Sequence, residues 1–247
     1  MRTALLLFSA ICLTTISSVQ AAAPDTTFTR ANTDYAAGKF RNAIKDYESL
    51  VKTGQWNPSL FYNLGNAYFR VDDLGRAILS YERALALAPH QPEARANLQL
   101  VRDRARALEL APGWVEQHLD FLTRDQYAWL AMIAFWGAIA IVAGLFFSSR
   151  RPVVWMFAAV SLGVIAAGAA AAVYELETGA AGRDLAIVTG KEVQARVATA
   201  ESAGAVLALP PGSEVKILST RGDWTYATLP NDMEGWIPAQ SAERVRL

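Results

Sequence analysis

The chain is poor in the residues that build compact chemical sites. One cysteine, Cys12, and two histidines, His90 and His118, occur among 247 residues. A single cysteine excludes an internal disulfide and a cysteine-based metal site. No nucleophile, base and orienting group occur at a spacing that indicates hydrolysis. The sequence therefore predicts a protein that is not an enzyme and that holds no metal or cofactor.

The chain also lacks an excess of charge of either sign. It carries 23 basic and 23 acidic residues, so its formal net charge is zero. Nucleic-acid binding requires a basic patch or stripe. The charge balance therefore excludes nucleic acid as an expected partner.

Charged residues are missing altogether from two long stretches, residues 126–149 and 152–174. Each is about the ~20 apolar residues that a membrane-spanning helix requires. The pattern predicts transmembrane helices at 126–149 and 153–174, joined by a turn at Arg150 and Arg151. The alternative is a buried hairpin in the core of a soluble all-helical protein.

The two arginines of this turn predict its side of the membrane, because short basic loops stay in the cytoplasm. Both flanking soluble parts should then lie outside the cytoplasm. Residues 1–22 agree with this arrangement. They combine Arg2, an apolar run and small residues before Pro24, as a cleavable secretory signal does. An uncleaved anchor is the alternative, and it exports the same parts.

Small residues recur every four positions on the second apolar stretch, at Ala159, Gly163, Ala167 and Ala171. This spacing places them on one helix face that a second helix can approach closely. The first apolar stretch is one candidate for that second helix. A span of a partner protein is the other.

A repeat of 34 residues covers the first soluble part. Shifting the sequence by 34 brings identical residues together: Asn32 and Asn66, Ala43 and Ala77, Ile44 and Ile78, Tyr47 and Tyr81, Glu48 and Glu82. The pair Asn63-Leu64 recurs as Asn97-Leu98. A period of 34 with two helices per unit is typical of tetratricopeptide repeats. We expect two such units and a capping helix at 92–110, within a repeat domain at 24–110.

The second unit resembles that family most closely, at Leu64-Gly65, Tyr68, Ala77, Tyr81, Ala84 and Pro89. The first unit departs from it, with Ala31 at the glycine position and Gln55 at the proline position. The resemblance implies a concave groove that grips a peptide or helix of a partner protein. The candidate partner-binding residues are Asn32, Tyr35, Asn63, Asn66 and Arg70. The alternative is that these side chains only solvate the surface.

Four arginines mark the outer face of the capping helix: Arg95, Arg102, Arg104 and Arg106. They predict a solvated face, with a binding patch as the alternative. Residues 111–125 follow, with apolar residues at helical spacing. We expect an amphipathic helix on the membrane interface, or a helix packed under the repeats.

After a predicted flexible linker at 175–182, residues 183–247 change to short β-runs separated by turns, which indicates a small all-β barrel. Its Gly222-Asp223-Trp224 and Gly235-Trp236-Ile237-Pro238 motifs resemble bacterial SH3-type domains. Residues 195–198 replace the Arg-x-Gly-Pro stretch usual in that family. Trp224 and Trp236 are candidate residues for a peptide groove of this barrel, and core positions are the alternative.

The order of leader, repeats, apolar hairpin and small barrel resembles the BatE-type proteins of bacterial aerotolerance operons. That resemblance implies a bacterial inner-membrane protein that works with von Willebrand type A domain proteins and a MoxR-type ATPase. It implies a role in oxidative or envelope stress tolerance. We therefore expect a membrane scaffold that binds protein partners. The alternative is a module that binds or senses the peptides of the cell wall.

Overall fold

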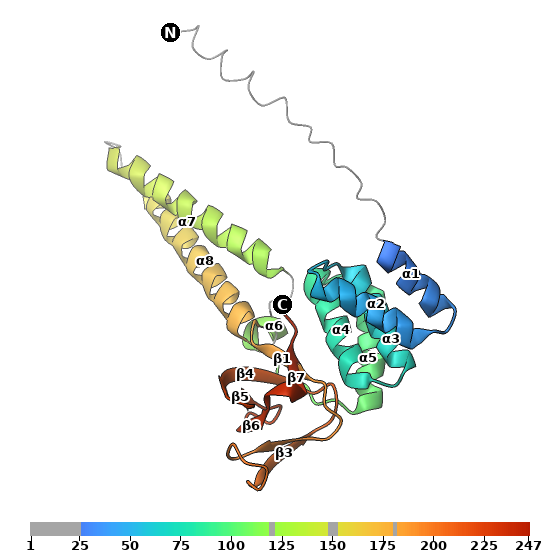
Figure 1. The fold of residues 1–247 in the computed structure, drawn as a ribbon. Helices are drawn as coiled ribbons and strands as arrows, with labels where there is room; N and C mark the ends of the chain where they lie inside the picture. The colour runs from blue at the N-terminus through green and yellow to red at the C-terminus, as the bar shows by residue number, and fades with distance from the viewer. Residues whose placement is uncertain (1–25, 119–121, 148–152, 180–181) are drawn as a thin grey trace.

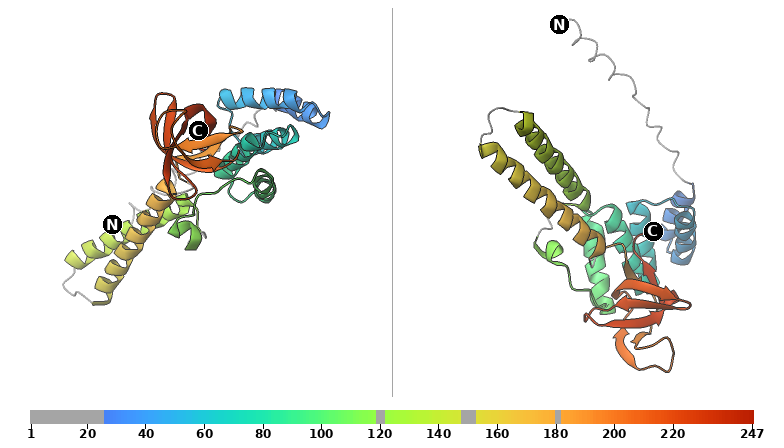
Figure 2. Two further views of the ribbon diagram at one scale, coloured as in Figure 1. Left: turned by 90° about the horizontal axis from the view of Figure 1, so that it is seen from below. Right: turned by 90° about the vertical axis from the view of Figure 1, so that its left-hand side faces the viewer.

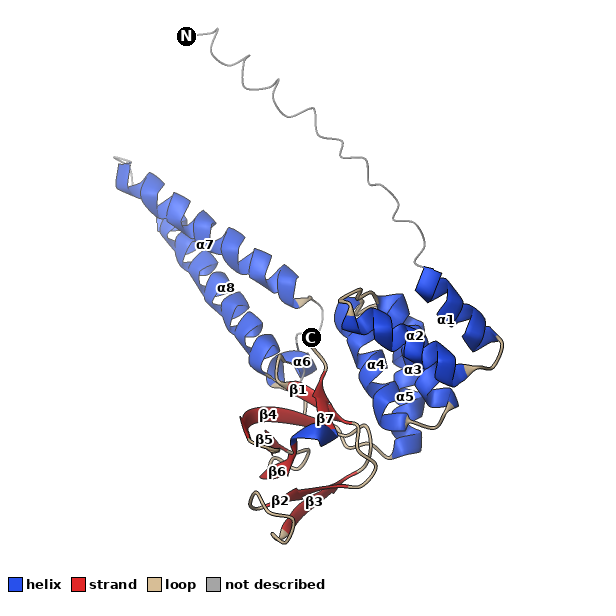
Figure 3. Ribbon diagram, viewed as in Figure 1, coloured by secondary structure: helices blue, strands red, loops and turns tan. Residues whose placement is uncertain are grey.

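A computed structural model describes residues 26–118, 122–147, 153–179 and 182–247 (Figure 1). The signal-peptide prediction for residues 1–22 and the turn at Arg150 and Arg151 lie outside the described residues. Helices fill the first two-thirds of the described chain and strands fill the last third (Figure 3). The parts are a stack of repeat helices, a pair of long apolar helices and a domain built on one antiparallel sheet.

The repeat helices are α1 (Thr26–Ala36), α2 (Phe40–Lys52), α3 (Pro58–Arg70), α4 (Leu74–Leu87) and α5 (Pro92–Ala105). Local sequence explains their ends. The Asn57 side chain accepts a hydrogen bond from the Leu60 amide at 2.8 Å, with Pro58 in the first helical turn. Gly38, with φ +76°, makes the turn between α1 and α2.

In both repeat units the helices pack around a buried tyrosine at the equivalent position. The side chains of Tyr47 and Tyr81 are each 1% exposed. A Cβ on Gly65 would lie 2.8 Å from the Tyr81 ring, so the glycine lets this ring pack against α3. Ala31 takes the place of that glycine in the first unit and is fully buried there. The first unit therefore has the same architecture despite its departures from the sequence motif.

The helices α7 (Arg124–Phe147) and α8 (Val153–Thr178) lie side by side and are long and apolar enough to cross a membrane. Most of their large apolar side chains are exposed. The face of α8 that packs inward carries Ala159, Ala166, Ala169 and Ala172. Gly163, Ala167 and Ala171 are exposed. Of the predicted small-residue face, only Ala159 therefore packs inside the pair.

Ion pairs and a hydrogen bond connect the start of α7 and the end of α8 to the sheet domain. The Glu177 carboxylate pairs with Arg124 of α7 at 3.0 Å, with Arg183 and with Arg246. The predicted linker is partly helical, because α8 continues to Thr178. The carbonyl of Thr178 accepts a hydrogen bond from the Lys216 ammonium. The short helix α6 (Trp114–His118) contacts α8.

The sheet domain, residues 185–247, has seven strands in the order β3-β2-β6-β5-β4-β1-β7, and all neighbouring pairs are antiparallel. The strands are β1 (Leu185–Val188), β2 (Val193–Arg196), β3 (Ala205–Leu209), β4 (Glu214–Arg221), β5 (Trp224–Thr228), β6 (Glu234–Pro238) and β7 (Ala242–Arg244). Irregular register in two pairs, β2–β3 and β4–β5, bends the sheet.

The sheet domain packs against the repeats through contacts between β1 and α4, and both views in Figure 2 show the two parts side by side. Strand β1 is buried along its whole length. Ala186 and Val188 belong to the core of the sheet domain, whereas Leu185 and Ile187 belong to the core of the repeats. We call this contact the joint. The repeats and the sheet domain therefore share one hydrophobic core.

Polar contacts close the edge of the joint. The Arg83 guanidinium on α4 donates to the Arg244 carbonyl at 2.8 Å. The Leu108 amide, after α5, donates to the Ser213 hydroxyl at 3.1 Å. The Glu214 amide donates back to the Leu108 carbonyl at 2.8 Å. The chain after α5 thus lies against the start of β4.

Candidate binding sites

Four asparagines form two matching pairs on the first helices of the three units. The Nδ2 of Asn63 on α3 donates to the Oδ1 of Asn32 on α1 at 3.0 Å. The Nδ2 of Asn97 on α5 donates to the Oδ1 of Asn66 on α3, also at 3.0 Å. The second pair is the first shifted by one repeat. The asparagines therefore link neighbouring units along one surface.

A buried tyrosine holds each pair in place. The hydroxyl of Tyr47 donates to the Oδ1 of Asn32 at 2.6 Å, and that of Tyr81 donates to the Oδ1 of Asn66 at 2.7 Å. Burial raises the pKa of Tyr47 to about 12, and it raises the pKa of Tyr81 further. Both hydroxyls therefore keep their protons near neutral pH and fix the orientation of the amides.

Each pair keeps one donor group and one acceptor available. Among the described residues, no hydrogen bond uses the Nδ2 of Asn32 or Asn66, or the Oδ1 of Asn63 or Asn97. All four side chains are partly exposed. An extended peptide presents N–H and C=O groups along its length. The pairs therefore offer the complement that a peptide backbone needs.

The other two predicted groove residues follow Asn32 and Asn66 by one turn on the same helices, Tyr35 on α1 and Arg70 on α3. Tyr35 packs edge-on against Phe40, with ring centroids 5.3 Å apart. The Arg70 guanidinium lies 4.6 Å from the centroid of the same ring. Both contact Phe40 at the start of α2. Asn97 joins the pairs although it was not a predicted site residue, and the 34-residue shift of Asn63 is the signal that could have found it.

Trp224 and Trp236 lie on the outer face of the sheet domain. Trp224 is in register with Pro238, and Tyr226 with Trp236. The Tyr226 and Trp236 rings are 4.9 Å apart between centroids. All four side chains are partly exposed, and the buried face of these strands carries Thr225, Ala227, Gly235 and Ile237. The tryptophans therefore form an aromatic surface rather than the core.

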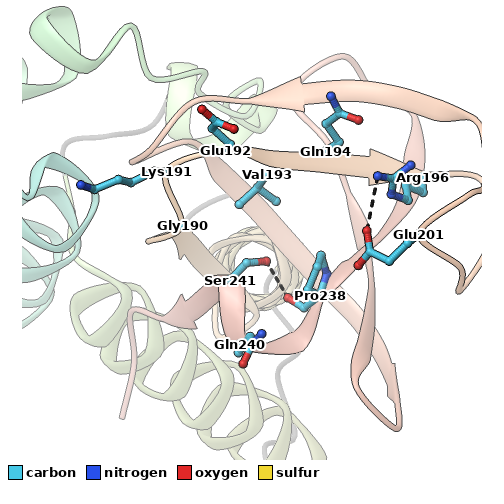
Figure 4. Close-up of a pocket in the computed structure, with 10 residues that line it drawn as sticks. All are labelled: Gly190, Lys191, Glu192, Val193, Gln194, Arg196, Glu201, Pro238, Gln240 and Ser241. Atoms are coloured by element: carbon cyan, nitrogen blue, oxygen red, sulfur yellow. Dashed lines mark hydrogen bonds and ion pairs between the residues drawn. The ribbon is translucent and has the colours of Figure 1, made fainter.

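A hollow of about 480 Å³ opens beside this aromatic surface (Figure 4). It lies between the segment that leads into β2 and the segment after β6. Its lining is mainly polar and includes Lys191, Glu192, Gln194, Arg196, Pro238 and Ser241. The Arg196 guanidinium donates to the Ala203 carbonyl at 2.8 Å, which fixes one wall.

Within the parts of the chain that the structure describes, no group of three or more His, Cys, Asp or Glu side chains could hold a metal ion. Of the two histidines, His118 has its Nδ1 3.0 Å from the Trp114 carbonyl oxygen. Its ring stacks on that of Trp114.

Comparison with protein families identifies the helical stack. The tetratricopeptide repeat family matches residues 28–92 and again residues 62–122. The two matches begin 34 residues apart, which is the period found in the sequence. No curated protein matches the chain. The N-terminal part therefore consists of tetratricopeptide repeats, which suggests protein–protein interaction as its role.

Proposed function

We propose that the protein is a non-enzymatic scaffold of the bacterial inner membrane. The observation that carries this proposal is the pair of asparagine contacts across the repeats. Their free donors and acceptors suit an extended peptide segment of a partner protein. The sheet domain contacts α4, Arg102 of α5 and the segment after α5, while the four asparagines stay partly exposed.

The arrangement along the chain supports a finer proposal. Repeats, apolar helix pair and an SH3-like sheet domain follow one another as in the BatE-type proteins. On this basis the partners are von Willebrand type A domain proteins and a MoxR-type ATPase, in envelope or oxidative stress tolerance. The exposed face of α8 at Gly163, Ala167 and Ala171 suits contact with a partner's span.

The groove can be tested by changing Asn63 and Asn97 together to alanine. These two residues donate to their partners, so Asn32 and Asn66 keep the hydrogen bonds from Tyr47 and Tyr81. We expect partner affinity to fall by about thirtyfold, since two binding contacts of ~1 kcal/mol each are lost, and crosslinking in native membranes should recover correspondingly less of the partners.

The matched control is Asn42→Ala, an exposed asparagine on α2, and it should recover the same partners as the natural protein. Unchanged recovery by the double variant would remove the groove from the proposal. Hydrogen exchange across α3 and α5 shows whether the double variant remains folded.

We further propose that both soluble parts lie outside the cytoplasm. An alkaline phosphatase reporter, which is active only after export, should be active when fused after Leu247. A fusion that ends at Arg151 should be inactive, because the turn is proposed to face the cytoplasm. The opposite pattern would reverse the orientation of the helix pair.

A second candidate function is binding of cell-wall peptides by the sheet domain. The aromatic surface of Trp224, Tyr226 and Trp236 beside a polar hollow favours it. The full chain in detergent should then co-sediment with purified cell wall. Trp224→Ala should weaken this binding by about tenfold or more, since aromatic anchors dominate such contacts. The exposed Leu218→Ala is the control, and absence of co-sedimentation would dismiss this function.

A further inference from the structure

Three carboxylates surround one guanidinium at the joint. The Nη2 of Arg102 on α5 contacts Glu82 of α4 at 2.6 Å and also contacts Glu214 of β4. Its Nη1 lies 3.2 Å from Glu109, which follows α5. We call these four residues the Arg102 cluster. It links α4 and α5 of the repeats to the sheet domain.

The cluster carries more negative than positive charge. Glu82 and Glu214 meet the same nitrogen atom, so their carboxylates lie close together. Their side chains are only 15% and 12% exposed. Two carboxylates so placed do not readily ionise together, and the pair tends to hold one proton. Burial raises the pKa of Glu82 to about 7, and the charges of Glu214 and Glu109 add to this rise against the opposing effect of Arg102.

Within the described chain, the charged groups that act on Glu82 are those of the cluster itself. Arg102 comes from α5, Glu109 from the segment after it and Glu214 from β4. The next residue on α4, Arg83, pairs instead with Glu243 of β7 at 3.5 Å. Arg83 therefore does not offset the excess negative charge at Glu82.

The same cluster holds the backbone of the joint. The Oε2 of Glu214 accepts a hydrogen bond from the Leu110 amide at 3.0 Å. The Glu214 amide donates to the Leu108 carbonyl. A change of charge on the two carboxylates therefore acts directly on the contact between repeats and sheet domain.

We propose that the Arg102 cluster makes the joint proton-responsive. The sheet domain is held most firmly against the repeats while Glu82 and Glu214 share a proton, and the joint loosens when rising pH ionises both. The closed joint binds this proton more tightly than the opened joint does. The extra stability is thus full below about pH 4.5, the ordinary pKa of the group, and is lost as the pH rises through about 7.

Hydrogen exchange of the full chain in detergent tests this proposal. Peptides covering residues 106–112 and 211–218 report on the joint, after correction for the intrinsic effect of pH on exchange. Between about pH 5 and pH 8 we expect the equilibrium constant for opening to rise by roughly ten- to a hundredfold, since one proton contributes up to tenfold per pH unit.

Glu82→Gln should abolish this dependence and keep the joint protected at every pH. The matched control is Glu48→Gln. Glu48 occupies the equivalent position one repeat earlier, where it accepts a hydrogen bond from the Tyr68 hydroxyl. This control should keep the pH dependence of the natural protein.

A joint whose opening does not change with pH overturns the proposal, and so does a Glu82→Gln variant that titrates like the natural protein. If that variant does not fold, Glu109→Gln serves instead, because the Glu109 side chain is 55% exposed. Removing its charge should move the midpoint of the transition to lower pH. An unchanged midpoint would also overturn the proposal.

Discussion

Replacing Ile187 with alanine should destabilise the repeats as well as the sheet domain. Ile187 is fully buried on β1, and its side chain belongs to the core of the repeats. Truncation of a buried isoleucine removes apolar contacts and leaves a cavity, at a cost of about 2–5 kcal/mol. The expected result is faster hydrogen exchange in α4 and in β1 together. Exchange measured by mass spectrometry on the full chain resolves both elements.

The matched control for this variant is Leu218→Ala, a truncation at a side chain that is 45% exposed. It should change stability by no more than about 0.5 kcal/mol. If Ile187→Ala accelerated exchange in the sheet domain alone, the repeats would be stable without β1. The shared core would then contribute nothing to their folding.

The second large effect is expected from Arg102→Met. Methionine fills much of the space but leaves Glu82 and Glu214 partly buried without their cation. Breaking a buried ion pair by removing one partner costs about 3–5 kcal/mol. The loss should be largest above about pH 7, where both carboxylates would otherwise be ionised. Denaturant unfolding at low and high pH measures this difference.

Arg104→Met on the same helix is the comparison. Arg104 pairs with Asp72 at 2.7 Å, but both side chains are more than half exposed. Exposed pairs contribute only about 0–1 kcal/mol, so this variant should unfold almost like the natural protein. Equal effects of the two variants would mean that burial adds nothing to the Arg102 cluster.

The repeats were the most predictable part of the fold. The shift of 34 residues reveals the units directly, and it also relates Asn63 to Asn97. The hydrogen bonds between units were not predictable, because a repeat pattern shows which positions are equivalent and not which ones touch. Tyr35 and Arg70 were predicted as groove residues together with the asparagines, and their contacts with Phe40 were likewise not visible in the repeat pattern.

The joint was not predicted, although β1 contains a signal for it. Residues 185–188 are all apolar, and an uninterrupted apolar run is typical of a strand buried on both faces. Arg102 was predicted to lie on a solvated face with Arg95, Arg104 and Arg106. That prediction was wrong for Arg102, whose side chain is 15% exposed. The spacing of charges on one helix cannot show that a domain more than a hundred residues later in the chain covers part of that helix.

The packing face of α8 was only partly predicted. The predicted small residues follow a strict spacing of four, whereas the packed positions 159, 166, 169 and 172 are separated by seven and by three. On a helix with 3.6 residues per turn, steps of four rotate the side-chain direction one way, whereas steps of seven and of three rotate it the other way. The two sets therefore share Ala159 and then diverge to opposite sides, so that Gly163, Ala167 and Ala171 are exposed. Strand β7 was missed because Ala242, Glu243 and Arg244 carry no alternation of apolar and polar residues.

The contacts between the end of α8 and the sheet domain have a mechanical consequence. Glu177 and Thr178 are bonded to the sheet domain, and β1 begins at Leu185 inside the shared core. Through these bonds and the shared core, a tilt or rotation of α8 is expected to act on α4. While the joint is closed, the asparagine surface should therefore keep a fixed orientation relative to the helix pair.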